Sequence, residues 1–350
     1  MIGMAAANGG CSAPAGTGDA TTSPSTAPAA TSAAGSPAGA TADSGKTLTG
    51  AGATFPAPLY QKWFQEYAQK GGVQINYQPI GSGGGIKAIS SHTVDFGASD
   101  APLSDDELKT APGLLHIPTV AGPVVVLYNL PGLTKPLNLD GATIAGMFDG
   151  KITTWNDPKI AALNPGVTLP ATPLVSVHRA DGSGTTNAFT TYLNTVSPDW
   201  KAIGAGKSVK WPGGVGAKGS PGVTALVQQT PGAVGYAELN FAQQNKVPFA
   251  AVRNAKGKFI TPSVDSTVAA AAGISLPPDF RKVIVNTPAP DGYPIASFTY
   301  LLVYPNAKPE VKPFLKWALT DGQKDASGLS YAPLPANVQK QALAQVEKLP

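Results

Sequence analysis

The stretch Arg179-Ala180-Asp181-Gly182-Ser183-Gly184-Thr185-Thr186 constrains the fold of this chain more than any other. Apolar residues at positions 174, 175 and 177 predict a strand before it, and apolar residues at helical spacing from 188 to 193 predict a helix after it. A strand that ends in small residues and opens a helix presents free backbone N–H groups at the positive end of the helix dipole. Because a guanidinium and two hydroxyls accompany them, this junction is equipped to hold a small oxyanion.

Two further junctions of this kind lie upstream. Gly50-Ala51-Gly52-Ala53-Thr54-Phe55-Pro56 precedes a helical pattern with Leu59, Trp63 and Tyr67 at intervals of four. Gly81-Ser82-Gly83-Gly84-Gly85 follows an alternating, strand-like run and precedes a short helix. Each has a plainer interpretation, a turn with an N-cap threonine for the first and a flexible turn for the second. Together with the Arg179 junction they would supply the Thr54, Ser82, Ser183 and Thr185 hydroxyls, the N–H groups of Phe55 and Gly184, and one fixed cation.

A carboxylate at a strand end adds selectivity to this donor set. Val94 and Phe96 predict a short strand that ends in Ala98-Ser99-Asp100, and Asp100 is either a turn residue or a residue that faces the crevice at the strand ends. An ionised carboxylate only accepts hydrogen bonds, so it favours an anion that still carries a proton. Phosphate at neutral pH keeps a proton and sulfate keeps none, so Asp100 would reject sulfate. Asp181 is expected to hold and partly neutralise Arg179.

Strand-like and helix-like patterns alternate through the chain, which predicts an α/β protein. The 350 residues, of which 42% are hydrophobic and 13% charged, suffice for two lobes with separate cores. The nearly continuous apolar run from Ile117 to Tyr128 predicts a buried central strand or a crossing between lobes. A net charge of +4 without an arginine- or lysine-rich run does not favour nucleic-acid binding.

Enzymatic chemistry has little support in the sequence. The histidines at positions 92, 116 and 178 do not have a metal-ligand spacing, so no metal site is expected. Ser183 lies in Asp-Gly-Ser-Gly-Thr, which lacks the flanking glycines of a G-x-S-x-G nucleophile elbow. We therefore expect a binding protein without a catalytic residue.

The first 45 residues differ in composition. The 34 residues between Cys11 and Lys46 are Ala, Ser, Thr, Pro and Gly apart from Asp19 and Asp43, which predicts a disordered tether spanning roughly 30 Å. Cys11 is the only cysteine, so it is either a free thiol or the lipidated cysteine of a bacterial lipoprotein. Residues 1–10 lack the basic region and the long apolar run of a secretion signal.

The motifs around Thr54, Ser82, Asp100 and Arg179, together with Gly235-Tyr236 and Tyr331-Ala332-Pro333-Leu334-Pro335, resemble the PstS family of phosphate-binding proteins. The resemblance extends from about residue 46 to the C-terminus. It implies a two-lobed type II periplasmic-binding-protein fold with inorganic phosphate in the cleft. It also implies delivery of phosphate to the permease and ATPase subunits of an ABC importer. By position, Thr54, Phe55, Ser82 and Asp100 would bind phosphate from the first lobe, and Arg179, Ser183, Gly184 and Thr185 from the second.

The family pattern places residues 46–120 and 290–350 in lobe I and residues 121–289 in lobe II. It also implies an extracytoplasmic location, in the periplasm or on the outer face of the membrane, for a protein that we expect to be monomeric. Alternatives are the same fold with selectivity for sulfate or molybdate, a surface-anchored phosphatase, and an interaction module with a vestigial pocket.

Overall fold

The computed structural model describes residues 46–272 and 274–350. The predictions for residues 1–45, including the tether and the state of Cys11, lie outside this range. No helix in the part described is long and apolar enough to cross a membrane.

The first part of the described chain alternates strands with helices, and its strands β1, β2 and β3 are parallel. Its elements are β1 (Thr47–Gly52), α1 (Ala57–Gln69), β2 (Gln74–Gln78), α2 (Ser82–Ser90), β3 (Phe96–Ser99) and α3 (Asp105–Thr110). The buried residues of α1 include Leu59, Tyr60, Trp63 and Phe64, the stripe that its sequence spacing predicts. Pro56 is the N-cap of α1, so Thr54 does not cap this helix.

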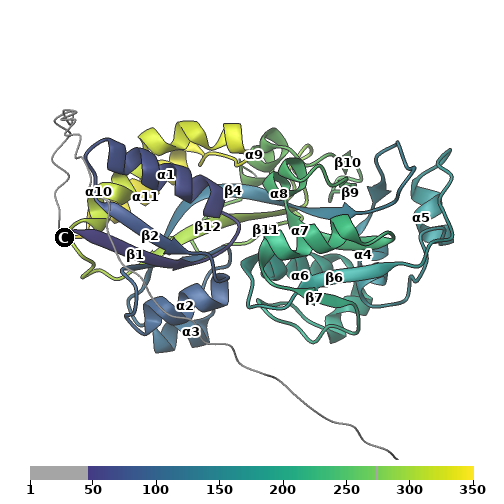
Figure 1. Ribbon diagram of the computed structural model, residues 1–350, viewed down its shortest axis with the longest axis horizontal. Coiled ribbons are helices and arrows are strands. Elements are labelled where there is room, and N and C mark those ends of the chain that lie inside the picture. The colour runs from purple at the N-terminus through teal and green to yellow at the C-terminus, as the bar shows by residue number, and fades with distance from the viewer. Residues whose placement is uncertain (1–45, 273) are drawn as a thin grey trace, which may run out of the picture. The chain divides into compact units, whose positions relative to one another are not determined.

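The long strand β4 (Leu115–Tyr128) and its partner β12 (Ile295–Val303) connect the two halves of the sheet. The strand order is β2-β1-β3-β12-β4-β8-β6-β7, with β11 (Ile284–Val285) also paired to β12. Residues 115–123 of β4 pair with β12, whereas residues 124–128 pair with β8. Figure 1 shows β4 and β12 running from the region of β1 toward that of α7 and β6.

The remaining elements follow the same alternating pattern. Around the second half of the sheet they are α4 (Gly141–Phe148), α5 (Pro158–Leu163), β6 (Val175–Arg179), α6 (Gly184–Val196), β7 (Val215–Ala217), α7 (Gly219–Gln229), β8 (Ala233–Glu238) and α8 (Leu239–Gln244). The strands β5 (Asn138–Leu139), β9 (Ala251–Arg253) and β10 (Phe259–Ile260) form a separate small sheet. Three helices, α9 (Val264–Ala272), α10 (Val311–Leu319) and α11 (Ala336–Val346), complete the α-helices of the described part. Short 3-10 segments cover Pro198–Ala202, Asp321–Asp325 and Ser327–Leu329.

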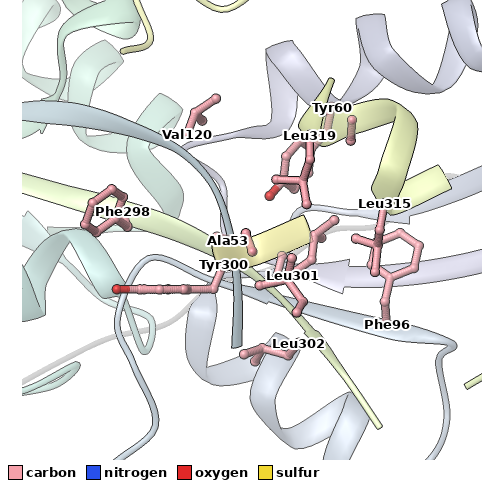
Figure 2. Packing of buried hydrophobic residues seen from close by; sticks show 14 of the residues in the cluster. Ala53, Tyr60, Phe96, Val120, Phe298, Tyr300, Leu301, Leu302, Leu315 and Leu319 are labelled. Atoms are coloured by element: carbon pink, nitrogen blue, oxygen red, sulfur yellow. The ribbon is translucent and has the colours of Figure 1, made fainter. Parts of the chain in front are cut away.

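The buried apolar residues form separate clusters, which we use to name the lobes. Lobe I comprises the elements packed on the cluster that joins β1, α1, β3, β12 and α10. Figure 2 shows part of it, with Tyr300, Leu301 and Leu302 of β12 near Ala53, Phe96 and Leu315. Lobe II comprises the elements packed on two clusters, one on each face of the sheet around β4, β6 and β8.

The sequence of strand β4 is almost uniformly apolar because both of its faces are buried. Val124, Val126 and Tyr128 belong to one lobe II cluster, and Val125 and Leu127 belong to the other. Successive side chains of a strand point to opposite faces of the sheet, so a strand covered on both faces carries no polar alternation. The α/β prediction and the two-lobed fold are confirmed.

The packing of residues in and after α9 differs from the expected lobe boundaries. Ala270, Ala271, Phe280 and Ile284 pack in the lobe I cluster, whereas the division taken from the family pattern assigns them to lobe II. Tyr293 and Ile295 pack in a lobe II cluster. The division of the chain at 121 and 290 therefore stays a prediction, and near residue 290 the chain contributes side chains to the cores of both lobes.

Candidate functional site

The three strand–helix junctions of the sequence meet where lobe I faces lobe II. Ser82 is the first residue of α2, and its Oγ accepts hydrogen bonds from the N–H of Gly184 (3.0 Å) and of Asp100 (3.2 Å). The Thr54 Oγ1 accepts from the N–H of Ser220 at 3.1 Å. The three junctions therefore surround one space, with Thr54, Ser82 and Asp100 on the lobe I side and Gly184 and Ser220 on the lobe II side.

Arg179 is the fixed positive charge of this site. It ends β6, and only 1% of its side chain is exposed. Its Nε and Nη2 donate to the two oxygens of Asp181 at 2.8 and 2.6 Å. Its Nη1 donates to Thr185 at 3.2 Å and to Ser220 at 3.1 Å. Burial raises the pKa of Asp181, but the bonds from Arg179 outweigh this and hold it below its ordinary value, so the carboxylate stays ionised.

Several hydroxyls of the site are arranged as hydrogen-bond donors. A hydroxyl has two lone pairs and one proton, and the two bonds that Ser82 accepts use both of its lone pairs. The Ser183 Oγ accepts from the N–H of Thr186 at 3.1 Å and so caps α6, which leaves its proton free to be donated. The first turns of α2 and α6 add backbone N–H groups and the positive ends of two helix dipoles. Such a set of donors suits an anion with several oxygen atoms.

Asp100 is the acceptor of the site. It follows β3, is 3% exposed, and its Oδ1 has no hydrogen-bond partner among residues 46–272 and 274–350. Burial raises the pKa of Asp100 well above its ordinary value, and the nearby Glu238 raises it further. An unpartnered buried carboxyl oxygen is costly, so this atom is suited to accept a proton from a ligand.

At this boundary the two lobes lie so close together that several glycine positions have no room for a Cβ atom. A Cβ on Gly184 would lie 2.6 Å from the carbonyl carbon and the Cβ of Asp100. A Cβ on Gly81, whose φ is +88°, would lie 2.2 Å from the Asp181 Oδ2. The backbones of Gly83 and Gly182 are joined by a hydrogen bond of 2.9 Å. Lys207 and Glu107 form an ion pair of 2.6 Å across the same boundary. The structure therefore shows the two lobes closed on each other.

A cavity of about 330 Å³ lies beside Thr54, and residues of both lobes line it. Thr54, Pro58 and Pro79 lie on the lobe I side, and Gly219 and Phe241 on the lobe II side. Because Thr54 contacts Ser220, this cavity borders the donor set described above.

The sequence interpretation missed two buried residues of the site, Ser220 and Glu238. Ser220 lies in the first turn of α7, and its hydroxyl accepts from Arg179. Glu238 ends β8, and its Oε1 accepts from the Thr185 hydroxyl at 2.5 Å. Both follow a strand and lie at or just before a helix, as the predicted residues do, so the same junction pattern could have found them. The predicted residues Thr54, Ser82, Asp100, Arg179, Asp181, Ser183, Gly184 and Thr185 are all at this boundary, and Phe55 follows Thr54 there.

His178, the histidine nearest to Ser183 in the sequence, has another contact. The His178 ring stacks on Trp211 with a centroid distance of 4.8 Å. No group of three or more His, Cys, Asp or Glu side chains that could hold a metal ion is present in the described part of the chain.

The comparisons with known proteins agree with this geometry. A family model described as the PBP superfamily domain matches residues 22–322. The phosphate-binding protein PstS of Xylella fastidiosa (strain 9a5c) is 45% identical over 303 residues, which are 84% of this chain and 83% of that protein. The chain belongs to the PstS family. The PstS of Pasteurella multocida (strain Pm70) is 42% identical over 315 residues, or 87% of this chain and 91% of that protein.

Solved structures show the same fold. A high-affinity periplasmic phosphate-binding protein, determined with phosphate bound at pH 8.5, superposes with a TM-score of 0.70 at 25% identity, covering 85% of this chain and 93% of that one. A phosphate-binding protein from Stenotrophomonas maltophilia has a TM-score of 0.68 at 22% identity, covering 86% and 94%. The family resemblance stated from the motifs is confirmed, and these PstS relatives are named as binding proteins rather than as enzymes.

Proposed function

We propose that this chain is an extracytoplasmic receptor that binds inorganic phosphate between its two lobes and delivers it to an ABC-type importer. The observation that carries the proposal is the combination of a buried donor set with an unpartnered buried acceptor, the Asp100 Oδ1. Hydrogen phosphate has oxygens to accept from the donors and one proton to give to Asp100. Family membership supports the same ligand.

The donors proposed for phosphate are the Thr54, Ser82, Ser183 and Thr185 hydroxyls, the Phe55 and Gly184 N–H groups, and the Arg179 guanidinium. In the structure the Gly184 N–H donates to Ser82, so the anion would compete with or share this bond. Asp181 keeps Arg179 oriented rather than touching the anion. No cofactor is proposed, and no residue is assigned a catalytic role.

Several partners follow from the same proposal. The permease and ATPase subunits of a phosphate importer would receive the ligand, and the chain would act as a monomer. Lipidation of Cys11 would attach the protein to the membrane surface through the segment before Lys46. Lobe I would comprise residues 46–120 and 290–350 and lobe II residues 121–289, although Phe280 and Ile284 pack in the lobe I core and Tyr293 and Ile295 in a lobe II core.

Phosphate would favour the closed state because it contacts both lobes only when they meet. We therefore expect Gly184→Ala to weaken phosphate binding about tenfold to a hundredfold, since its methyl group would overlap Asp100 in the closed state. The thermal midpoint of the ligand-free protein should change little, because opening the lobes relieves the overlap. Calorimetric titration and thermal unfolding measure the two effects.

Gly213→Ala is the matched control, because a Cβ at Gly213 meets no atom within 4 Å. Equal phosphate affinity of the Gly184 and Gly213 variants would contradict the closed-state role.

Thermal unfolding in the presence of phosphate tests the proposal itself. A ligand that binds only the folded state stabilises it by about 2.7 kcal/mol at a hundredfold excess over Kd. We expect a rise in melting temperature with phosphate and none with chloride at the same ionic strength. A chromogenic phosphate ester tests the phosphatase alternative, for which turnover would be the supporting result. No stabilisation by phosphate would favour the interaction-module alternative.

A further inference from the structure

Glu238 is a second buried carboxyl group at the site, distinct from Asp100. It ends β8, is 1% exposed, and its Oε2 has no hydrogen-bond partner in the described part of the chain. Its Oε1 lies 2.5 Å from the Thr185 Oγ1. The Thr185 Oγ1 in turn accepts from the Arg179 Nη1 at 3.2 Å. Glu238 therefore contacts Thr185, one of the residues proposed to bind phosphate.

The hydrogen bonds of Thr185 depend on which atom supplies the proton between it and Glu238. An ionised Glu238 can only accept, so the single Thr185 proton would be given to it and none would remain for an anion. A neutral Glu238 can donate to Thr185. The threonine oxygen then accepts from both Glu238 and Arg179, which uses its two lone pairs, and its own proton is left for the ligand.

The charges around Glu238 favour the neutral form. Arg179 on β6 is the cation that faces it, but the guanidinium is already paired with Asp181. Asp100, after β3, is another buried carboxyl group, whose pKa is raised by burial and by Glu238, and Tyr331 is a neutral neighbour from lobe I. Two ionised carboxylates beside a bound anion would leave several buried negative charges with one cation. Burial raises the pKa of Glu238 above its ordinary value despite the bond from Thr185 and the charge of Arg179.

Building on the phosphate function proposed above, we propose that Glu238 is a positioning residue that stays a neutral carboxylic acid and donates its proton to Thr185. The Thr185 hydroxyl is thereby directed at the bound phosphate. Glu238 sets the direction of one ligand hydrogen bond and keeps a negative charge out of the anion site. Above the pKa of Glu238, the Thr185 proton would turn to the carboxylate, and phosphate would lose one donor.

The protonation state can be read in the wild-type protein. The chain has five glutamates, and the pKa values of the other four, Glu66, Glu107, Glu310 and Glu347, are lowered. A hydrogen bond to lysine is the largest cause of the lowered pKa for Glu66, Glu310 and Glu347. For Glu107, burial acts on the pKa in the opposite direction, but the hydrogen bonds from Lys207 and Ser104 outweigh it. With ¹³C-labelled glutamate carboxyls and phosphate bound at pH 7, NMR should therefore show one protonated resonance. Glu238→Gln should remove it, whereas the matched control Glu347→Gln should remove an ionised one.

A double-mutant cycle with Thr185→Val tests the mechanism. Removing the hydroxyl should lower phosphate affinity about tenfold to a hundredfold at pH 7, in the wild type and in Glu238→Gln alike, because the amide also donates to Thr185. As pH rises, the effect of Thr185→Val should shrink in the wild type as the protonated resonance titrates, and should stay constant in Glu238→Gln.

Two results would overturn the inference. One is the absence of a protonated glutamate in the phosphate complex at pH 7, which needs no variant. The other is a Thr185→Val effect that is small in the wild type and large in Glu238→Gln, the pattern of an ionised Glu238. Failure of the wild type to bind phosphate at all would instead refute the proposed function.

Discussion

Replacing Arg179 with methionine is expected to reduce phosphate affinity by at least about a thousandfold. Arg179 is the cation that the geometry directs at the anion, and a hydrogen bond from a charged donor is worth about 1.5–3 kcal/mol. The substitution also leaves the Asp181 carboxylate without its partner, so the site changes from a cationic to an anionic environment. Attraction would become repulsion. Calorimetric titration with phosphate measures the change.

The same substitution should destabilise the ligand-free protein by about 3–5 kcal/mol, because it removes one partner of a buried ion pair. Adding Asp181→Asn should recover part of this stability but not the phosphate affinity. The matched control is Arg253→Met. The Arg253 side chain is 40% exposed, and solvent screens its ion pair with Asp140. This substitution should change stability by less than about 1 kcal/mol. Phosphate affinity close to that of the wild type in Arg179→Met would contradict the assignment.

Asp100→Asn is expected to abolish most of the discrimination between phosphate and sulfate. At a pH above the pKa of Asp100, the wild-type acceptor should reject sulfate by a factor of about 10⁴ or more, because the mismatch would bury an unpaired carboxylate against a fully ionised anion. An amide can accept a hydrogen bond through Oδ1 or donate one through Nδ2. Phosphate affinity should therefore fall only about tenfold, while sulfate binding appears. Competition titrations with both anions give the ratio.

Asp100→Asn should increase the stability of the ligand-free protein, although it lowers the affinity for phosphate. Burial raises the pKa of Asp100, so its neutral form is favoured by folding, and this contribution is lost as pH rises from the unfolded-state pKa through the folded-state one. Asp100→Asn should therefore raise the melting temperature at pH 8. Asp106→Asn, whose side chain is 87% exposed, is the control and should change neither property. A variant that still rejects sulfate would show that selectivity lies elsewhere.

Local patterns explain why much of the fold could be predicted. Ser104 and Glu107 form a capping box at the start of α3, and such a cap depends only on residues within one turn. The Arg179 junction begins a helix at Gly184 for the same reason. The apolar run of β4 indicated a strand buried on both faces, and the two lobe II clusters cover those faces.

Long-range contacts explain what the sequence interpretation missed. Strand β7 lies in a glycine-rich stretch without an apolar pattern, and it forms by pairing with β6 although Val215 is exposed. Phe280 and Ile284 enter the lobe I core from a segment expected in lobe II, because packing rather than chain order decides their place. Glu238 and Ser220 lie at strand–helix junctions other than the three whose motifs predicted the anion site. Their relevance comes from the contacts with Thr185, Thr54 and Arg179, which folding brings together.

We propose that a set of fixed donors and the buried acceptor Asp100 select an anion that carries a proton. Calorimetric titration of the phosphate-free wild-type protein at pH 7 to 8, with phosphate and then with sulfate, tests it most directly. We expect binding of one phosphate per chain and no heat of binding from sulfate at the same concentrations. Equal binding of the two anions, or binding of neither, would contradict it.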